Sequence, residues 1–200
     1  MRFAPSGPAT YLFTMFRKLA TFLLLAGLIL SVPQAATARQ DDPKLGELFD
    51  LLYDAEHPSE IGALTHLIWQ IWSKSGSETT DYLFKAGVRA MAQGDLAKAL
   101  KRFSAIIEID PEFAEAWNKR ATVSFMMGDY KASVLDVQKT VSLEPRHFGA
   151  WSGLGMIYMR LEYHELALKA FRRALKANPH LPGAREQIIE LKTIISGSKT

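Results

Sequence analysis

The sequence predicts an all-α solenoid, a row of helix pairs that repeat along the chain. Pro111, Pro145 and Pro179 recur with a period of 34, and each ends a stretch in which apolar residues recur at helical spacing. A Gly-Asp pair divides the stretch at Gly94 and again at Gly128, and such pairs are typical of one helix ending and another beginning. The period and its division therefore predict two antiparallel helices in each repeat.

Residues of the same kind fall into register when the chain is aligned on the three prolines. Large residues share some columns and small residues share others, as expected where helices pack closely against their neighbours. The columns, in chain order, are Leu83, Trp117 and Trp151; Gly87, Ala121 and Gly155; Ala99, Ser133 and Ala167; and Phe103, Val137 and Phe171.

These columns resemble the tetratricopeptide repeat (TPR), whose pattern is W-x2-L-G-x2-Y, then A-x3-F, then P. The resemblance covers residues 80–179, half the chain, and implies three TPR repeats over residues 79–179. The third repeat matches the pattern most fully, at Trp151, Leu154, Gly155, Tyr158, Ala167, Phe171, Ala174 and Pro179.

The third repeat departs from the pattern at the turn between its two helices, where Glu162 and Tyr163 replace the Gly-Asp pair. A residue with a side chain loses about 1 kcal/mol in the left-handed conformation that glycine adopts at such a turn. We therefore expect this turn to take another shape.

Helices are also predicted on both sides of the repeats. When the period is extended towards the N-terminus, Trp69 falls in the Phe column, but Tyr53 and Thr65 occupy small-residue columns. Residues 39–78 are therefore either a degenerate fourth repeat or a separate helical hairpin, and both interpretations stay open. Residues 180–200 are predicted to form a capping helix with one apolar face, followed by a tail.

The segment 1–38 has the three parts of a secretory signal peptide. Arg17 and Lys18 provide positive charge, an uncharged apolar run follows, and residues 36–38 read Ala-Thr-Ala, a cleavage pattern. We predict a signal peptide over residues 1–38, with translation starting at Met15, and export across the inner membrane to the periplasm. The apolar run is about half of the roughly 20 residues that a membrane helix needs. We therefore expect no stable membrane span after cleavage; the alternative is an uncleaved anchor.

Charge is unevenly spread along the chain. The formal net charge of +3 comes entirely from the segment 1–38, and the rest of the chain holds 21 basic and 21 acidic side chains. This balance gives no reason to expect binding to nucleic acid, which needs a basic patch. Residues 39–78 hold 3 basic and 8 acidic residues, whereas residues 146–200 hold 9 basic and 4 acidic ones. Ends of opposite charge suggest head-to-tail association into a homo-oligomer; the alternative is that surface charge only keeps the protein soluble.

The sequence contains no pattern for catalysis or cofactor binding. It has no cysteine, no glycine-rich phosphate loop that ends in Gly-Lys-Ser or Gly-Lys-Thr, and no His-Glu-x-x-His zinc motif. Its five histidines are dispersed, and we expect each to lie on the surface or to cap a helix. We therefore predict a protein that is not an enzyme and that has no cofactor and no metal.

In the TPR family the first helices of successive repeats line a concave groove that holds an extended peptide or a helix, and the resemblance implies such a groove here. One subfamily clamps a C-terminal carboxylate with lysine, arginine and asparagine in these columns. Only Asn118 matches that set, because Val88 replaces an asparagine and Gly149 and Ser152 replace cations. Glu115 belongs to the same face. The implied groove residues are Phe84, Val88, Met91, Asn118, Thr122, Phe125, Met126, Ser152, Met156 and Met159.

A groove without the clamp is apolar and rich in methionine, which suits an apolar segment or helix of a partner protein. The alternative is that the methionines belong to the core, or that the N-terminal hairpin fills the groove itself. We expect an exported scaffold that binds another protein in a cell-envelope assembly. The other hypotheses are a self-assembling structural subunit and an accessory protein that binds a small ligand.

Overall fold

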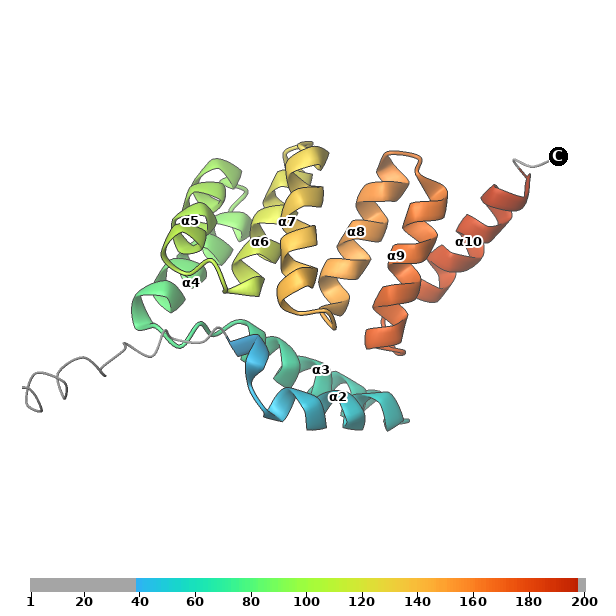
Figure 1. The fold of residues 1–200 in the computed structure, drawn as a ribbon, viewed down its shortest axis with the longest axis horizontal. Helices are drawn as coiled ribbons and strands as arrows, with labels where there is room; N and C mark the ends of the chain where they lie inside the picture. The colour runs from blue at the N-terminus through green and yellow to red at the C-terminus, as the bar shows by residue number, and fades with distance from the viewer. Residues whose placement is uncertain (1–38, 198–200) are drawn as a thin grey trace, which may run out of the picture. The chain divides into compact units, whose positions relative to one another are not determined.

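The three predicted repeats are three pairs of antiparallel helices, followed by one more helix (Figure 1). The computed structural model describes residues 39–197, which lie within one compact unit. Each helix of these pairs packs on its neighbours along the chain, as does the helix that follows them, and no strand occurs within the described range, so the predicted all-α solenoid is confirmed. The helices are α4 (Glu78–Ala92), α5 (Leu96–Ile109), α6 (Ala114–Met126), α7 (Tyr130–Leu143), α8 (Phe148–Arg160), α9 (His164–Ala177) and α10 (Ala184–Gly197).

Two predictions about the ends of the chain fall outside the described residues. These are the signal peptide over residues 1–38, with its start at Met15, and the end of the tail at residues 198–200. Within residues 39–197, no helix combines the length and the apolar composition that crossing a bilayer requires.

The turns inside the first two repeats have the predicted form. Gly94 and Gly128 adopt φ values of +74° and +81°, the left-handed conformation in which glycine has no steric penalty. The next residues cap α5 and α7, because the side chain of Asp95 accepts a hydrogen bond from the N–H of Lys98 and Asp129 does the same at α7. Both roles follow from the Gly-Asp pairs in the sequence.

The turn of the third repeat has the same shape, so the expectation of a different turn is wrong. Glu162 adopts a φ of +61°. Its N–H donates to the carbonyl of Met159 over 3.0 Å, and the N–H of Tyr163 donates to the carbonyl of Tyr158 over 2.8 Å. The equivalent two hydrogen bonds occur at the Gly94 turn. The packing of α8 against α9 therefore imposes the left-handed conformation on a residue that carries a side chain.

Glu162→Gly is expected to raise the free energy of unfolding by about 0.5–1 kcal/mol, because it removes the left-handed penalty but adds freedom to the unfolded chain. Thermal unfolding followed by circular dichroism measures the change. Lys169→Gly is the control: this residue is exposed in the middle of α9, and the same substitution there should lower stability by about 1 kcal/mol. A fall in the melting temperature of Glu162→Gly would contradict the expectation.

In the core of the repeats, residues of the small columns lie against residues of the large columns. A Cβ atom added at Gly87 would lie 2.8 Å from the ring of Phe103, and one added at Gly155 would lie 2.8 Å from the ring of Phe171. Both rings are buried, with exposed fractions of 0% and 1%. The small residue of each first helix therefore makes room for the aromatic residue of the second.

An equivalent hydrogen bond recurs at the successive joints between repeats. The indole Nε1–H of Trp117 donates to the carbonyl of Pro111, and that of Trp151 donates to the carbonyl of Pro145, each over 2.9 Å. Arg185 of α10 follows Trp151 by one full period, and its Nη2 donates to the carbonyl of Pro179 over 2.8 Å. Helix α10 therefore makes the same contact at its joint as the first helices of the second and third repeats.

The N-terminal hairpin consists of α2 (Lys44–Asp54) and α3 (Pro58–Trp72), preceded by the short 3-10 helix η1 (Arg39–Asp41). The apolar core between its helices also contains Phe148 of α8 and reaches Ala177 and Leu181 at the end of the third repeat. The core of α4 and α5 includes no residue of the hairpin. Residues 44–72 thus form a hairpin that crosses the ends of the repeat helices, and they do not stack on α4 as a preceding repeat would (Figure 1).

Candidate functional site

A cleft of about 160 Å³ opens between α6, α7 and α8, on the face where the sequence places the groove. Four of the predicted groove residues line it: Asn118, Thr122 and Phe125 from α6, and Met156 from α8. Its other lining residues are Ala121, Ser133, Val137, Gly149, Gly153 and Ile157.

Two hydroxyl groups that line the cleft are already hydrogen-bonded. The hydroxyl of Ser133 donates to the carbonyl of Ala121 over 2.7 Å, and the hydroxyl of Thr122 donates to the carbonyl of Asn118 over 2.9 Å. These groups have little to offer a polar ligand, because their donors are used within the chain.

Apolar surface and open space remain in the cleft. Met156 is 47% exposed, and nothing lies within 4 Å of the place where a Cβ atom of Gly153 would be. Phe125 forms an aromatic pair with Tyr130, and the two ring centroids lie 5.5 Å apart. The cleft therefore fits an apolar side chain better than a charged one.

The other predicted groove residues differ in exposure. Val88 and Met126 are exposed, at 38% and 51%, while Met91, Ser152 and Met159 are half-buried. Met91 packs on the core of the first repeats, and Met159 packs on the core of α9 and α10.

Phe84 is a core residue, so its prediction as part of the groove is wrong. Its side chain is 4% exposed, and its ring centroid lies 5.8 Å from that of Phe103 and 5.4 Å from that of Phe113. The cause is Phe113, which directly precedes α6 and packs on the ring from the second repeat.

A buried polar network lies beside the cleft, at the start of α6 and α8. The carboxylate of Glu115 accepts hydrogen bonds from Asn118 Nδ2 over 2.9 Å and from His147 Nε2 over 2.8 Å, and its other oxygen lies 3.0 Å from Lys119 Nζ. Burial alone would raise the pKa of Glu115, but the Lys119 ammonium and the hydrogen bond from His147 outweigh it and hold that pKa below its usual range. Glu115 is therefore a buried, charged carboxylate with its partners in place.

The hydrogen bonds of His147 define its tautomer. Its Nδ1 accepts the N–H of Ala150 over 3.0 Å and thereby caps α8, so the ring proton is on Nε2, which donates to Glu115. The side chain of His147 is fully buried. The expectation that each histidine lies on the surface or caps a helix holds for this one only in its capping role.

The hairpin covers this network with two tryptophans. The ring of Trp72 stacks on that of His147, with centroids 4.2 Å apart and planes 10° apart. The ring of Trp69 lies so close to Gly149 that a Cβ atom there would be 2.7 Å away, and Lys119 Nζ lies 5.2 Å from its centroid. Because Gly149 also lines the cleft, α3 borders one end of it.

Trp69, Trp72 and His147 are not among the site residues that the sequence predicts. Two signals for this contact are present in the chain: the tryptophans are three positions apart on one helix, and Gly149 stands where the earlier repeats carry Asp81 and Glu115. A glycine in that column indicates a close approach by another part of the chain.

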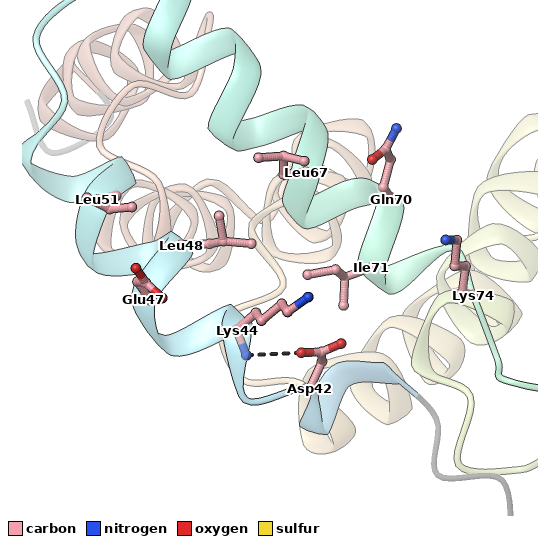
Figure 2. A pocket seen from close by; sticks show the side chains of 9 residues that line it. All are labelled: Asp42, Lys44, Glu47, Leu48, Leu51, Leu67, Gln70, Ile71 and Lys74. Atoms are coloured by element: carbon pink, nitrogen blue, oxygen red, sulfur yellow. Dashed lines mark hydrogen bonds between the residues drawn. The ribbon is translucent and has the colours of Figure 1, made fainter.

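A second hollow, of about 470 Å³, lies between α2 and α3 (Figure 2). Its walls are apolar, and its rim carries both charges. Figure 2 shows Leu48 and Leu51 of α2 near Leu67 and Ile71 of α3, with the remaining labels on Asp42, Lys44, Glu47, Gln70 and Lys74. None of the predicted groove residues lines it. The part of the chain that the structure describes holds no group of three or more side chains arranged to bind a metal ion.

The sequence and the fold match known proteins. Tetratricopeptide repeat families match residues 84–140 and 148–181. A TPR repeat-containing protein of Rhizobium etli is 32% identical over 169 residues, which cover 84% of this chain and 83% of that protein. Anaphase-promoting complex subunit 3 of Schizosaccharomyces pombe is 31% identical over 88 residues, 44% of this chain and 13% of that protein.

Solved structures resemble the repeat region. The first TPR of Spaghetti (RPAP3), bound to an HSP90 peptide, has a TM-score of 0.58 at 21% identity and covers 60% of this chain and 95% of its own. The Sgt2 TPR domain of Aspergillus fumigatus has a TM-score of 0.58 at 20% identity, over 62% of this chain and 83% of that one. The chain has a period of 34, folds into helix pairs and is similar to most of the Rhizobium protein. It therefore belongs to the tetratricopeptide repeat family.

Proposed function

We propose that this chain is an exported scaffold that binds an apolar segment of another protein in the cleft between α6 and α8. The observation that carries the proposal is the cleft itself, which is lined by Phe125 and Met156 and in which the hydroxyls of Thr122 and Ser133 are hydrogen-bonded within the chain. Proteins of this family mediate protein–protein interaction, and two structural neighbours are TPR domains in complex with an HSP90 peptide and with pHsp70.

The proposed ligand is an apolar segment and not a C-terminal carboxylate. Lys119 is the cation beside the cleft, and it is paired with the buried carboxylate of Glu115 and lies by the ring of Trp69. Gly149 and Ser152 supply no positive charge. A carboxylate in this cleft would lose its hydration without gaining an unpaired cation.

The signal peptide predicted over residues 1–38 supports a site of action outside the cytoplasm, in an assembly of the cell envelope. In this proposal the mature chain begins near Arg39, directly at η1. Proteins of this family and the structural neighbours of this chain are mainly non-enzymatic scaffolds, so the proposal is a binding protein and not an enzyme.

Met156→Glu is expected to reduce capture of the partner at least tenfold, because it puts an unpaired charge where an apolar side chain would be buried. Gly153→Leu should have the same effect by filling the cleft. The measurement is quantitative capture from envelope extract with tagged protein purified after export, whose intact mass also tests the mature N-terminus near Arg39.

The matched control is Met127→Glu, since Met127 is 50% exposed at the end of α6 and does not line the cleft. It should retain the partners that the unmodified protein captures. If Met156→Glu and Gly153→Leu are folded and retain every partner, the cleft is not the binding site.

A further inference from the structure

The aromatic edge of α3 sits on a surface that the repeats provide. Trp69 and Trp72 are three positions apart, so both rings leave the helix on one side. Trp72 is 2% exposed, and its ring centroid lies 5.1 Å from that of Phe148, while the ring of Trp69 meets the same phenylalanine edge-on at 5.6 Å. The interface thus includes two indoles against the start of α8, beside Phe49 of α2, whose ring centroid lies 6.4 Å from that of Phe148.

The repeat side of this interface has a fixed shape. The ring of His147 is held at both nitrogens, by the N–H of Ala150 and by the carboxylate of Glu115, and all of these groups belong to the repeats. Gly149 leaves the space that Trp69 fills, because a Cβ atom there would overlap the indole. The repeats therefore present a preformed platform and a slot for aromatic side chains.

Helix α3 fits the platform imperfectly. The Nε1–H of Trp72 is buried and has no hydrogen-bond acceptor, and a buried donor without a partner costs free energy that an apolar ring does not. The hairpin is otherwise joined to α4 through residues 73–77, where the N–H and hydroxyl of Ser75 donate to Asp81. A helix with phenylalanine at the second aromatic position would avoid the unsatisfied donor and still stack on His147.

We propose that the surface of His147, Phe148 and Gly149 is a helix-docking site, that α3 is its resident occupant, and that a partner helix with two aromatic residues three positions apart displaces it. This inference goes beyond the proposed function, because it stands whether or not the neighbouring cleft holds a ligand. The partner's recognised chemistry is an amphipathic helix with tryptophan or phenylalanine at the first position and phenylalanine at the second.

The test uses a fluorescein-labelled peptide of residues 58–74 that carries Trp72→Phe, added to the exported chain and followed by fluorescence anisotropy. The receptor variant Trp69→Ala/Trp72→Ala, here called the emptied variant, removes both indoles of α3 from the platform. We expect the peptide to bind this variant at least tenfold more tightly than the unmodified chain, and more tightly than a peptide with the native sequence does. Adding Gly149→Ala to the emptied variant should remove the binding, because the new methyl group occupies the slot.

Leu67→Ala is the matched receptor control, since Leu67 is 44% exposed and lines the hollow between α2 and α3. This variant should bind the peptide as weakly as the unmodified chain. The proposal is overturned if the emptied and unmodified chains bind the peptide equally, or if Gly149→Ala leaves the binding unchanged.

A second measurement does not depend on the double variant. Gly149→Ala alone should loosen the hairpin, so that trypsin cleaves after Lys74, in the segment between α3 and α4, at least tenfold faster while the circular dichroism of the repeats is retained. An unchanged cleavage rate would mean that the slot does not hold Trp69 in place, and the proposal would be wrong.

Discussion

Asp136→Ala is expected to lower the free energy of unfolding of the repeats by about 2–4 kcal/mol. The carboxylate of Asp136 on α7 accepts two hydrogen bonds of 2.7 Å from the guanidinium of Arg120 on α6. The same guanidinium donates to the hydroxyl of Ser104 on α5 over 3.3 Å and lies 4.9 Å from the ring of Trp117. One ion pair therefore joins three consecutive helices across the joint between the first two repeats.

The large effect follows from burial. The side chain of Asp136 is 7% exposed and that of Arg120 is 23% exposed, so removal of the carboxylate leaves a partly desolvated cation without a counter-charge. The remaining exposure of Arg120 keeps the expected loss below that of a fully buried pair. Urea denaturation followed by circular dichroism measures the change in the midpoint.

Glu112→Ala is the matched control for this prediction. Glu112 and Lys139 also form an ion pair between second-repeat residues, at 3.6 Å, but their side chains are 65% and 37% exposed. Loss of an exposed pair should change stability by less than about 1 kcal/mol. Equal midpoints for Asp136→Ala and Glu112→Ala would show that the buried pair contributes no more than the exposed one.

Glu115→Gln is expected to cost about 1.5–3 kcal/mol, because it replaces a charged acceptor of buried hydrogen bonds by a neutral one. The substitution keeps the size of the side chain, so the loss reports on charge and hydrogen bonding and not on a cavity. Three groups lose a charged partner, Asn118, Lys119 and His147, and the last of these supports the hairpin through Trp72. Chemical denaturation of both proteins at neutral pH measures the difference.

The same variant predicts a pH dependence. The pKa of Glu115 is lower in the folded protein than its ordinary value of 4.5, so the unfolded state binds the proton more readily. The stabilisation by this carboxylate is therefore fully present above about pH 4.5 and is lost as the pH falls through the lowered folded-state pKa. The stability difference between the unmodified chain and Glu115→Gln should be constant above that pH and should shrink below it.

The exposed residue Glu112 again provides the control, since Glu112→Gln changes the same functional group three positions earlier on the chain. Its stability should differ from that of the unmodified chain by less than about 1 kcal/mol at neutral pH. A difference between Glu115→Gln and the unmodified chain that grows as the pH falls would contradict the assignment of a lowered pKa.

The repeats could be predicted because their signals are local and recur. Each Gly-Asp turn, each small residue opposite an aromatic ring and each proline lies within a single repeat unit, so one copy confirms another. The turn at Glu162 keeps the geometry of the other repeats, because its neighbours impose the left-handed conformation even without glycine. Helix packing decided that conformation over the local preference of the residue.

The position of the hairpin could not be predicted, because it depends on contacts between distant residues. Trp72 and His147 are 75 positions apart, and no period relates them. The repeat period places Trp69 in the Phe column of a possible fourth repeat, whereas its ring lies by Gly149 of the third repeat. Phe84 was misplaced for a similar reason, since Phe113 of the next repeat buries it.

The four tryptophans of the chain fall into two pairs with different surroundings. Trp117 and Trp151 each bond a loop carbonyl at a joint between repeats, whereas Trp69 and Trp72 lie between the hairpin and the third repeat. Because indole emission responds to neighbouring groups and to solvent, the chain carries two intrinsic optical reporters, one for the joints and one for the hairpin. Phenylalanine in place of either pair leaves the other to be observed alone.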